Sequence, residues 1–365
     1  MTQDAPLRIV MPAPPPTRGP IPKIAELLAA GLRASGCEVA ALAWGRRGGS
    51  ASGRVLEVGA DVRRIRQAVT RGRPDVVLVH TSHDPRALAR DIPLALSIRS
   101  SPSRLVLQLH GSRADLLDRP GSPLLKRATA FLLHRVDGVL LLSSEEKRAF
   151  ERFDPHGSFH VVANPYLPAP PGPPVTVLEH DVPVILFAAR LLPEKGVLDT
   201  VEALAVLRQR VAARLVIAGD GPAMGAVRRL VAERGLSEHV AVVGHLSEER
   251  LVEAFRAADA FALPTYHPEG FPTAISDAMS AGLPIVTTSL RGNADHLVEG
   301  TNALFVPPRD PVALAGALER VLTDTDLRRR MSSANLEKVA DFAPERVAPA
   351  YVAALREIGQ RPRRG

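Results

Sequence analysis

Short apolar runs alternate with amphipathic stretches along the first half of the chain. Apolar runs without polar alternation predict strands that are buried on both faces, and apolar residues three and four apart predict helices. The predicted strands are 7–14, 37–44, 75–80, 104–111 and 136–143, and the predicted helices include 23–36 and 60–74. Strands separated by helices imply parallel pairing through crossover connections, so we expect a sheet that is covered by helices on both faces.

A proline-rich stretch interrupts this pattern and then the pattern restarts. Residues 164–183 hold seven prolines and can continue neither a helix nor a strand. Further strands are predicted at 184–190, 214–220, 240–244, 260–265 and 283–288, with helices between them. We therefore expect an α/β fold of two Rossmann-like βα-repeat domains that face each other across a cleft. The expected divisions are an N-terminal domain at 1–168, a linker at 169–182, a C-terminal domain at 183–343, and a helix with a basic tail at 344–365 that packs back on the N-terminal domain.

The composition excludes several classes of protein. Of the 365 residues, 45% are hydrophobic and 23% are charged, which excludes a wholly disordered chain. No apolar run reaches the length of a membrane-spanning helix, and the first residues lack the pattern of a signal peptide. The single cysteine, Cys37, excludes an intramolecular disulfide and a multi-cysteine zinc site. We expect a cytoplasmic protein.

The strongest chemical signal is the segment 264–288, PTYHPEGFPTAISDAMSAGLPIVTT. A strand ends at its start, a loop carries Glu269 and Gly270, and a helix begins near Thr273. Free amides at such a helix start, here those of Phe271 and Thr273, form a site for an anion. Asp277 lies about one turn into the helix. Taken alone, Glu269 could equally be a plain loop acid and Asp277 a solvated helix residue.

Two upstream segments supply further candidates. AARLLPEKG (188–196) places Arg190 and Lys195 on the loop that leaves the first strand of the second domain. Arginine offers a planar fork for phosphate oxygens and lysine a mobile point charge, so both suit the same anion. AGDGP (218–222) supplies a tight turn with Gly219 and Gly221 at the end of the next strand. Seen in isolation, the two cations could also be a solvated surface pair.

Together these segments resemble the retaining, sugar-nucleotide-dependent glycosyltransferases of family 4, or glycosyltransferase group 1, which have the two-domain GT-B fold. The resemblance covers nearly the whole chain and is most specific over 184–310. It implies that Arg190 and Lys195 bind the donor diphosphate. It also implies that Glu269 contacts donor sugar hydroxyls near the reacting carbon. Asp277 replaces the second glutamate of the family's E-x7-E motif and is implied to bond the ribose hydroxyls.

The N-terminal half resembles the family less closely. PAPPPTRGPIPK (12–23) stands where members carry a glycine-rich loop, which leaves Gly19 as a weaker candidate. The absence of GxGxxG there argues against a nicotinamide site. At LQLHGS the resemblance implies that His110 lies beside the donor sugar, with Gly111 next to it. In the second domain His245 is a weaker candidate near the base.

We assign no ligand role to the remaining strand-end histidines, His80 and His83, and no metal to them, because two histidines without other ligands make no convincing site.

The reaction implied by the resemblance is hexosyl transfer from a nucleoside-diphosphate sugar to an acceptor hydroxyl, with retention of configuration and no cofactor. No Asp-x-Asp stands in a strand-end loop, so we expect metal independence, with arginine and lysine in the cation's role. The favoured acceptor is a growing polysaccharide or a lipid-linked saccharide, in cell-surface polysaccharide or glycolipid assembly. Open alternatives are a soluble small-molecule acceptor such as a natural product, an epimerase or phosphorylase on the same fold, and a non-catalytic nucleotide-sugar-binding protein.

The net charge of +7 is distributed unevenly. Residues 1–175 hold 24 Lys and Arg against 15 Asp and Glu, whereas the remainder holds 22 against 24. The low aromatic content, 4%, and the lack of a nucleic-acid-binding motif argue against a nucleic acid partner. Arginine-rich stretches at 63–73 and 113–135 predict a basic face on the acceptor-binding domain, suited to an anionic membrane surface on the inner side of the membrane. Coding bias alone is the other explanation of the arginine content.

Overall fold

The computed structural model describes residues 5–15, 20–45, 51–114, 117, 123–168 and 181–363, without the side chains of 51–55. The chain forms two compact units. Unit 1 comprises Met1–Leu167, Pro268–Phe271 and Phe342–Gly365, and unit 2 comprises Pro168–His267 and Pro272–Asp341. The expected linker 169–182 lies outside the described residues except for its last two positions.

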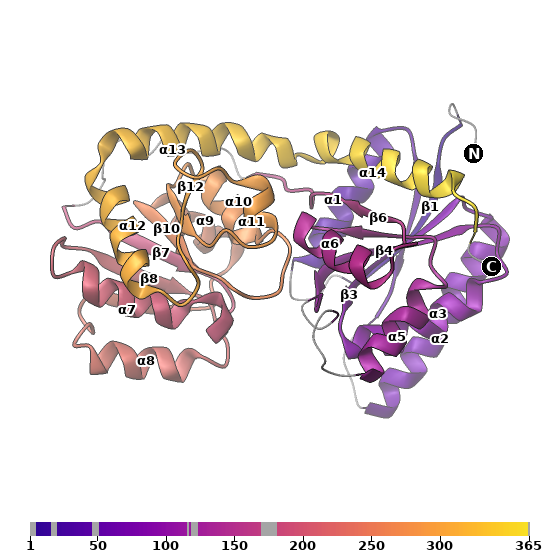
Figure 1. The fold of residues 1–365 in the computed structure, drawn as a ribbon, viewed down its shortest axis with the longest axis horizontal. Helices are drawn as coiled ribbons and strands as arrows, with labels where there is room; N and C mark the ends of the chain where they lie inside the picture. Colours follow the sequence, from indigo (N-terminus) through magenta and orange to yellow (C-terminus); the bar gives the residue numbers. More distant parts are fainter. Residues whose placement is uncertain are drawn as a thin grey trace. The chain divides into compact units, whose positions relative to one another are not determined.

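Unit 1 is built on a six-stranded parallel sheet with the strand order β2-β1-β3-β4-β5-β6 (Figure 1). Its strands are β1 (Arg8–Ala13), β2 (Glu38–Ala43), β3 (Val76–His83), β4 (Arg104–Ser112), β5 (Gly138–Leu141) and β6 (Phe159–Val161). Its helices are α1 (Ile21–Ala34), α2 (Ala51–Gly72), α3 (Pro85–Ile98), α5 (Pro123–Leu133), α6 (Ser144–Phe153) and α14 (Pro344–Gln360). A helix between successive parallel strands returns the chain across a face of the sheet, as the sequence pattern predicts.

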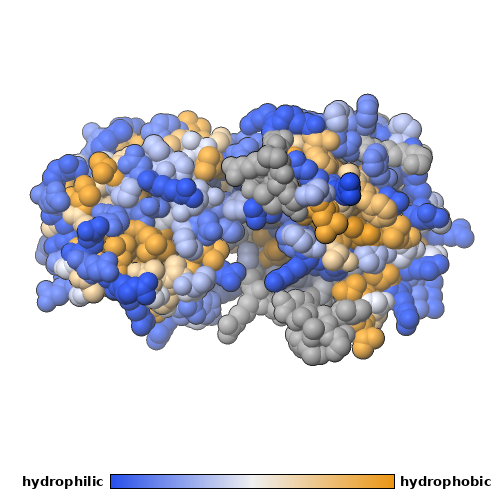
Figure 2. All heavy atoms as spheres, turned by 60° about the horizontal axis from the view of Figure 1, so that its bottom comes forward, coloured by the Kyte–Doolittle hydropathy of each residue, from blue (hydrophilic) through white to orange (hydrophobic). Residues whose placement is uncertain are grey.

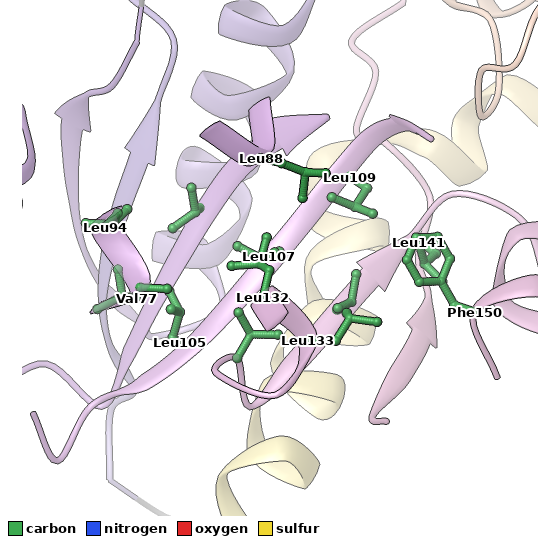
Figure 3. Close-up of a cluster of buried hydrophobic side chains, with 14 of the residues drawn as sticks. Val77, Leu88, Leu94, Leu105, Leu107, Leu109, Leu132, Leu133, Leu141 and Phe150 are labelled. Atoms are coloured by element: carbon green, nitrogen blue, oxygen red, sulfur yellow. The ribbon is translucent and has the colours of Figure 1, made fainter. Parts of the chain in front are cut away.

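Two apolar clusters lie on the two faces of this sheet. On one face, Leu105, Leu107 and Leu109 of β4 pack with side chains of α2, α3 and α5 (Figure 3). They share a face because successive strand residues point to opposite sides. On the other face, Val106 joins a cluster that includes residues of α1 and α14. The sheet of unit 1 is therefore the middle of three layers.

The C-terminal helix α14 belongs to unit 1 although unit 2 precedes it in the chain. It packs along α1. Tyr351 is fully buried, and its hydroxyl accepts a hydrogen bond of 2.7 Å from the Gln108 side chain and donates one of 3.2 Å to the Ala163 carbonyl. Beyond the helix, the Arg363 guanidinium donates to the carbonyls of residues 101–103. These contacts fix α14 and the residues that follow it to unit 1.

Unit 2 has a second six-stranded parallel sheet, in the order β12-β11-β10-β7-β8-β9. Its strands are β7 (Val184–Ala188), β8 (Arg214–Ala218), β9 (Val240–Gly244), β10 (Ala260–Leu263), β11 (Ile285–Thr287) and β12 (Ala303–Phe305). Its helices are α7 (Val197–Leu207), α8 (Met224–Glu233), α9 (Glu248–Arg256), α10 (Thr273–Ser280), α11 (Gly292–His296), α12 (Pro311–Thr323) and α13 (Thr325–Lys338). The expected pair of Rossmann-like domains is confirmed.

The structure corrects the sequence prediction in its details. Each sheet has a sixth strand, β6 and β12, that the prediction lacked. Both are three residues long and lie at a sheet edge, too short for a recognisable apolar run. The helix predicted over 60–74 spans Ala51–Gly72, because two glycines at its start hid the helical pattern. Within the described part of the chain, no helix is long and apolar enough to cross a membrane.

Candidate active site

The sheet of unit 2 has a switch point between β7 and β10. From β7 the chain continues to β8 and β9 on one side, and the later strands β10, β11 and β12 lie on the other side. In open parallel sheets, ligands bind outside the carboxyl ends of the strands at such a point. The loops after β7 and β10 are therefore the first place to look for a ligand site in this unit.

The loop after β7 carries the two predicted cations. Arg190 is exposed, whereas Lys195 is only 8% exposed and ends a short 3-10 helix, Pro193–Lys195. Gly196 follows with φ +77°, and a Cβ there would lie 2.5 Å from the Pro264 carbonyl oxygen. Only glycine fits this left-handed, closely packed position. Gly196 thus lets the Lys195 loop approach the end of β10.

The loop after β8 packs against the Arg190 loop. Gly219 has φ +141°, and a Cβ on it would collide with the Ala189 carbonyl oxygen. A Cβ on Gly221 would lie 2.5 Å from the Leu191 carbonyl oxygen. The Leu191 amide also donates to the Asp220 carbonyl, at 2.9 Å. The predicted glycines Gly219 and Gly221 therefore fix the backbone on both sides of Arg190.

The loop after β10 is joined to the Lys195 loop through the backbone. The Tyr266 amide donates to the Glu194 carbonyl at 2.8 Å, and the Thr265 hydroxyl donates to the same oxygen at 3.4 Å. The Thr288 hydroxyl, after β11, donates to the Thr265 carbonyl at 2.5 Å. The strand-end loops after β7, β8, β10 and β11 thus form one connected edge of unit 2.

Helix α10 begins at Thr273, as predicted. Its N-cap residue is Pro272, whose side chain has no acceptor to offer the first amides. The start of a helix presents N–H groups and a positive dipole end to an anion. Asp277 lies on the next turn and is half-buried. Thr273, Asp277, Arg190 and Lys195 all belong to unit 2.

The preceding segment, Pro268–Phe271, groups with unit 1. A Cβ on Gly270 would collide with the Leu142 side chain, directly after β5. The Phe271 ring stacks on that of Phe342, with centroids 5.2 Å apart. A Cβ on Gly111 would lie 3.5 Å from the Pro268 carbonyl oxygen. The half-buried Glu269 is thus carried by a segment that packs at the strand ends of unit 1, close to Gly111.

His110, on β4, contacts another histidine, which the sequence pattern did not predict. Nε2 of His110 lies 2.8 Å from Nδ1 of His80 on β3, and the two rings are nearly parallel, at 16°. His80 pairs with Gln108 in the β3–β4 register, which brings His80 and His110 together. The strand predicted over 75–80 continues to His83, so His80 lies within β3 rather than at its end. His80 is fully buried, and its Nε2 has no hydrogen-bond partner among the residues that the structure describes. In the sequence, both histidines stand at or next to the end of a predicted strand, and this placement was the signal that could have indicated their contact.

Both imidazoles of this pair are neutral at physiological pH. Burial lowers the pKa of His110 to about 4, with a smaller opposing contribution from Asn164. Burial and the neighbouring His110 lower the pKa of His80 well below its usual value. Two neutral imidazoles share one proton across their contact, so one ring donates and the other accepts. His80 therefore restricts the tautomer and the orientation of His110.

The remaining strand-end histidines, His245 and His83, do not join the residues described above. His245 follows β9 and is exposed. Nε2 of the buried His83 lies 2.8 Å from the Thr129 hydroxyl, a contact with α5 inside the fold. Gly19 lies outside the described residues. Among the side chains that the structure describes, no group of three or more His, Cys, Asp or Glu is placed to hold a metal ion.

Comparisons with known proteins match both halves of the chain. Residues 23–166 match the family described as Glycosyltransferase Family 4, and residues 173–338 match Glycosyl transferases group 1. Alpha-D-kanosaminyltransferase of Streptomyces kanamyceticus is 28% identical over 79% of this chain and 78% of its own length. Glycogen synthase of Mycobacterium tuberculosis (strain CDC 1551 / Oshkosh) is 29% identical over 78% of this chain and 70% of its own length.

A solved structure has the same fold. Anabaena Alr3699/HepE in complex with UDP-glucose matches with a TM-score of 0.71 and 17% identity, over 96% of this chain and 100% of that one. The likeness extends over both Rossmann-like units. With a family 4 match in the first half and a group 1 match in the second, the chain is a glycosyltransferase of the GT-B fold.

Proposed function

We propose that the enzyme transfers a hexosyl group from a nucleoside-diphosphate sugar to an acceptor hydroxyl, with retention of configuration and without a metal ion. The observation that carries this proposal is the connected edge of unit 2, where the loop with Arg190 and Lys195 stands at the β7–β10 switch point and is hydrogen-bonded to the loop that leads to α10. A diphosphate suits such a site because cations and helix-start amides both stabilise its oxygens. The UDP-glucose bound by the Anabaena protein supports this class of donor.

The proposed step breaks the bond between the anomeric carbon and the β-phosphate oxygen. The acceptor oxygen forms a new bond to the same carbon, on the face that the phosphate leaves, and its proton passes to the departing phosphate. Negative charge therefore builds on the diphosphate in the transition state. Lys195 is suited to stabilise it, because a cation in a mostly buried position acts through a lower dielectric than water.

Residues of unit 1 have a separate part in the proposal. Glu269 contacts donor sugar hydroxyls near the reacting carbon, and His110 lies beside the sugar. Gly270, Phe271 and Gly111 shape the backbone around these two side chains, as their close packing supports. In unit 2, Asp277 holds the ribose hydroxyls from α10, and His245 borders the base.

The favoured acceptor is a polysaccharide or lipid-linked saccharide, and glycogen synthase among the relatives supports a saccharide. A soluble small molecule is the second candidate, which the relative named alpha-D-kanosaminyltransferase favours. A third candidate is binding of a nucleotide sugar without turnover, which is favoured by Asp277 in place of the family's second glutamate and by the missing glycine pair at 12–23.

The test is incubation with UDP-, GDP- and ADP-hexoses, each with an oligosaccharide, a lipid-linked saccharide or a small aglycone. We expect release of one nucleoside diphosphate with one acceptor class, an unchanged anomeric configuration by NMR, and full activity with EDTA. A product of inverted configuration would contradict retention, and loss of activity with EDTA would contradict metal independence. If the donor binds tightly but no diphosphate is released with any acceptor, only the third candidate remains, which is binding of a nucleotide sugar without turnover.

A further inference from the structure

Three neighbouring helices cover one face of the unit 1 sheet. Helix α3 packs against α2 on one side and α5 on the other (Figure 1). Their inner sides supply Ile65, Leu94 and Leu132 to the core. Their outer sides form a continuous surface, which we call the α2–α3–α5 face.

This face is strongly basic. Its exposed arginines are Arg63, Arg64, Arg66 and Arg71 on α2, Arg86 on α3 and Arg127 on α5. The carboxylates of Asp61 and Asp91 are buried and paired with Arg64 and Arg90, and Glu57 is half-buried. Among the described side chains of these three helices, no exposed carboxylate neutralises the arginines. Apart from Arg64, which pairs with Asp61, the exposed arginines therefore present their positive charge to the surroundings of the protein.

The same face also exposes large apolar side chains. Leu56 on α2 is 76% exposed and Leu124 on α5 is 77% exposed, with Leu96 and Phe131 exposed to smaller extents. Figure 2, in which these helices come forward, shows apolar and strongly hydrophilic side chains next to one another on unit 1. Apolar side chains grouped with cations on one surface indicate a partner that is both apolar and anionic.

We propose that the α2–α3–α5 face docks unit 1 on an anionic lipid surface. Lipid phosphates would pair with the arginines, while Leu56 and Leu124 would enter the boundary between headgroups and acyl chains. A nucleic acid would satisfy the charges but not the leucines. A second copy of the chain would bring like charges together across the contact. The proposal concerns a partner rather than the sugar transfer, so it stands or falls independently of the proposed donor chemistry.

The test measures sedimentation of the full chain with vesicles of phosphatidylcholine alone or mixed with phosphatidylglycerol, without any nucleotide sugar. We expect binding to the anionic vesicles only, weakened by high salt. The variant R63Q/R66Q/R71Q should bind about 100-fold more weakly, since each basic residue near an anionic surface contributes about fivefold. The variant L56S/L124S should also bind vesicles more weakly. At high salt, where the charges are screened, its loss of binding should be larger than that of the arginine variant.

The matched control is R214Q/R228Q/R229Q, which removes three exposed arginines from unit 2 with the same change in net charge. It should bind vesicles like the unaltered chain. Equal losses in the two triple variants would overturn the proposal in favour of a general polyanion effect. Absence of vesicle binding would also overturn it, as would a concentration-dependent dimer that L124S abolishes while vesicle binding persists. Circular dichroism and thermal unfolding of each variant establish that it is folded.

Discussion

The Nδ1 atom of His80 lies 2.8 Å from Nε2 of His110, so the imidazole expected beside the donor sugar has one ring nitrogen already engaged. The contact joins two neighbouring parallel strands, with His80 inside β3 and His110 near the carboxyl end of β4. Since no charged group is part of it and both rings are neutral, it acts by fixing a tautomer rather than by supplying charge.

Replacing His80 should therefore impair catalysis through His110. We expect His80→Leu to lower kcat by about 10- to 100-fold, the usual effect of losing such an orienting partner, with little change in the donor KM. His80→Asn keeps a nitrogen near the position of Nδ1 and should restore most of the rate. Steady-state kinetics of both variants distinguishes an orienting role of His80 from a packing role. Equal losses of kcat in the two variants would mean that His80 only fills space.

The buried histidines should make the protein less stable in acid. A folded-state pKa of about 4 for His110 against about 6.5 unfolded means that the unfolded chain binds more protons within that window. Stability is thus fully present above about pH 6.5 and falls as the pH drops toward 4. Urea unfolding at pH 7 and pH 5 should show a smaller difference in H80Q/H110Q than in the unaltered chain. An equal difference would contradict the neutral pair.

Lys195→Ala should abolish measurable sugar transfer while the fold stays intact. Loss of one group that stabilises charge in the transition state typically lowers kcat by about 100- to 1000-fold. Lys338→Ala removes a lysine whose ion pair with Asp341 is on the surface, and it should leave kcat unchanged. Near-normal turnover in Lys195→Ala would remove this residue from the proposed site.

Glu269→Ala should likewise abolish turnover, for a different reason. Its carboxylate is proposed to contact the donor sugar and not the nucleotide, so binding of the free nucleoside diphosphate should be preserved. Calorimetric titration with the diphosphate separates this outcome from the Lys195 variant, which should bind it weakly. The control Glu253→Ala changes an exposed carboxylate on α9. Full activity of Glu269→Ala would refute its role.

Gly219→Ala should displace the Arg190 loop. The added methyl meets the Ala189 carbonyl oxygen at a backbone angle that alanine avoids, and such strain costs about 1–3 kcal/mol. We expect a lower melting temperature and weaker diphosphate binding. Gly225→Ala, within α8 and with space for a methyl group, should instead stabilise the helix by about 0.5–1 kcal/mol. Unaltered diphosphate binding in Gly219→Ala would show that the loop does not depend on this glycine.

The sequence predicts the two sheets because buried parallel strands leave long apolar runs, such as the one that becomes β4. It also predicts the loop that holds Arg190 and Lys195, since glycines and prolines mark the turns around them. The His80–His110 contact depends on the register between two strands, which no local pattern specifies. The packing of Pro268–Phe271 with unit 1 also depends on tertiary contacts. The sequence of this segment indicates only a loop and does not specify which unit the loop contacts.

The return of α14 to unit 1 reverses the order in which the chain can mature during synthesis. Tyr351, Leu355 and Ile358 complete the cluster that covers Leu28 and Leu32 of α1. Until these last residues have left the ribosome, that face of the first-made unit lacks its cover, whereas almost all of unit 2 has already emerged. The half of the protein that is translated first is therefore the half whose core is finished last.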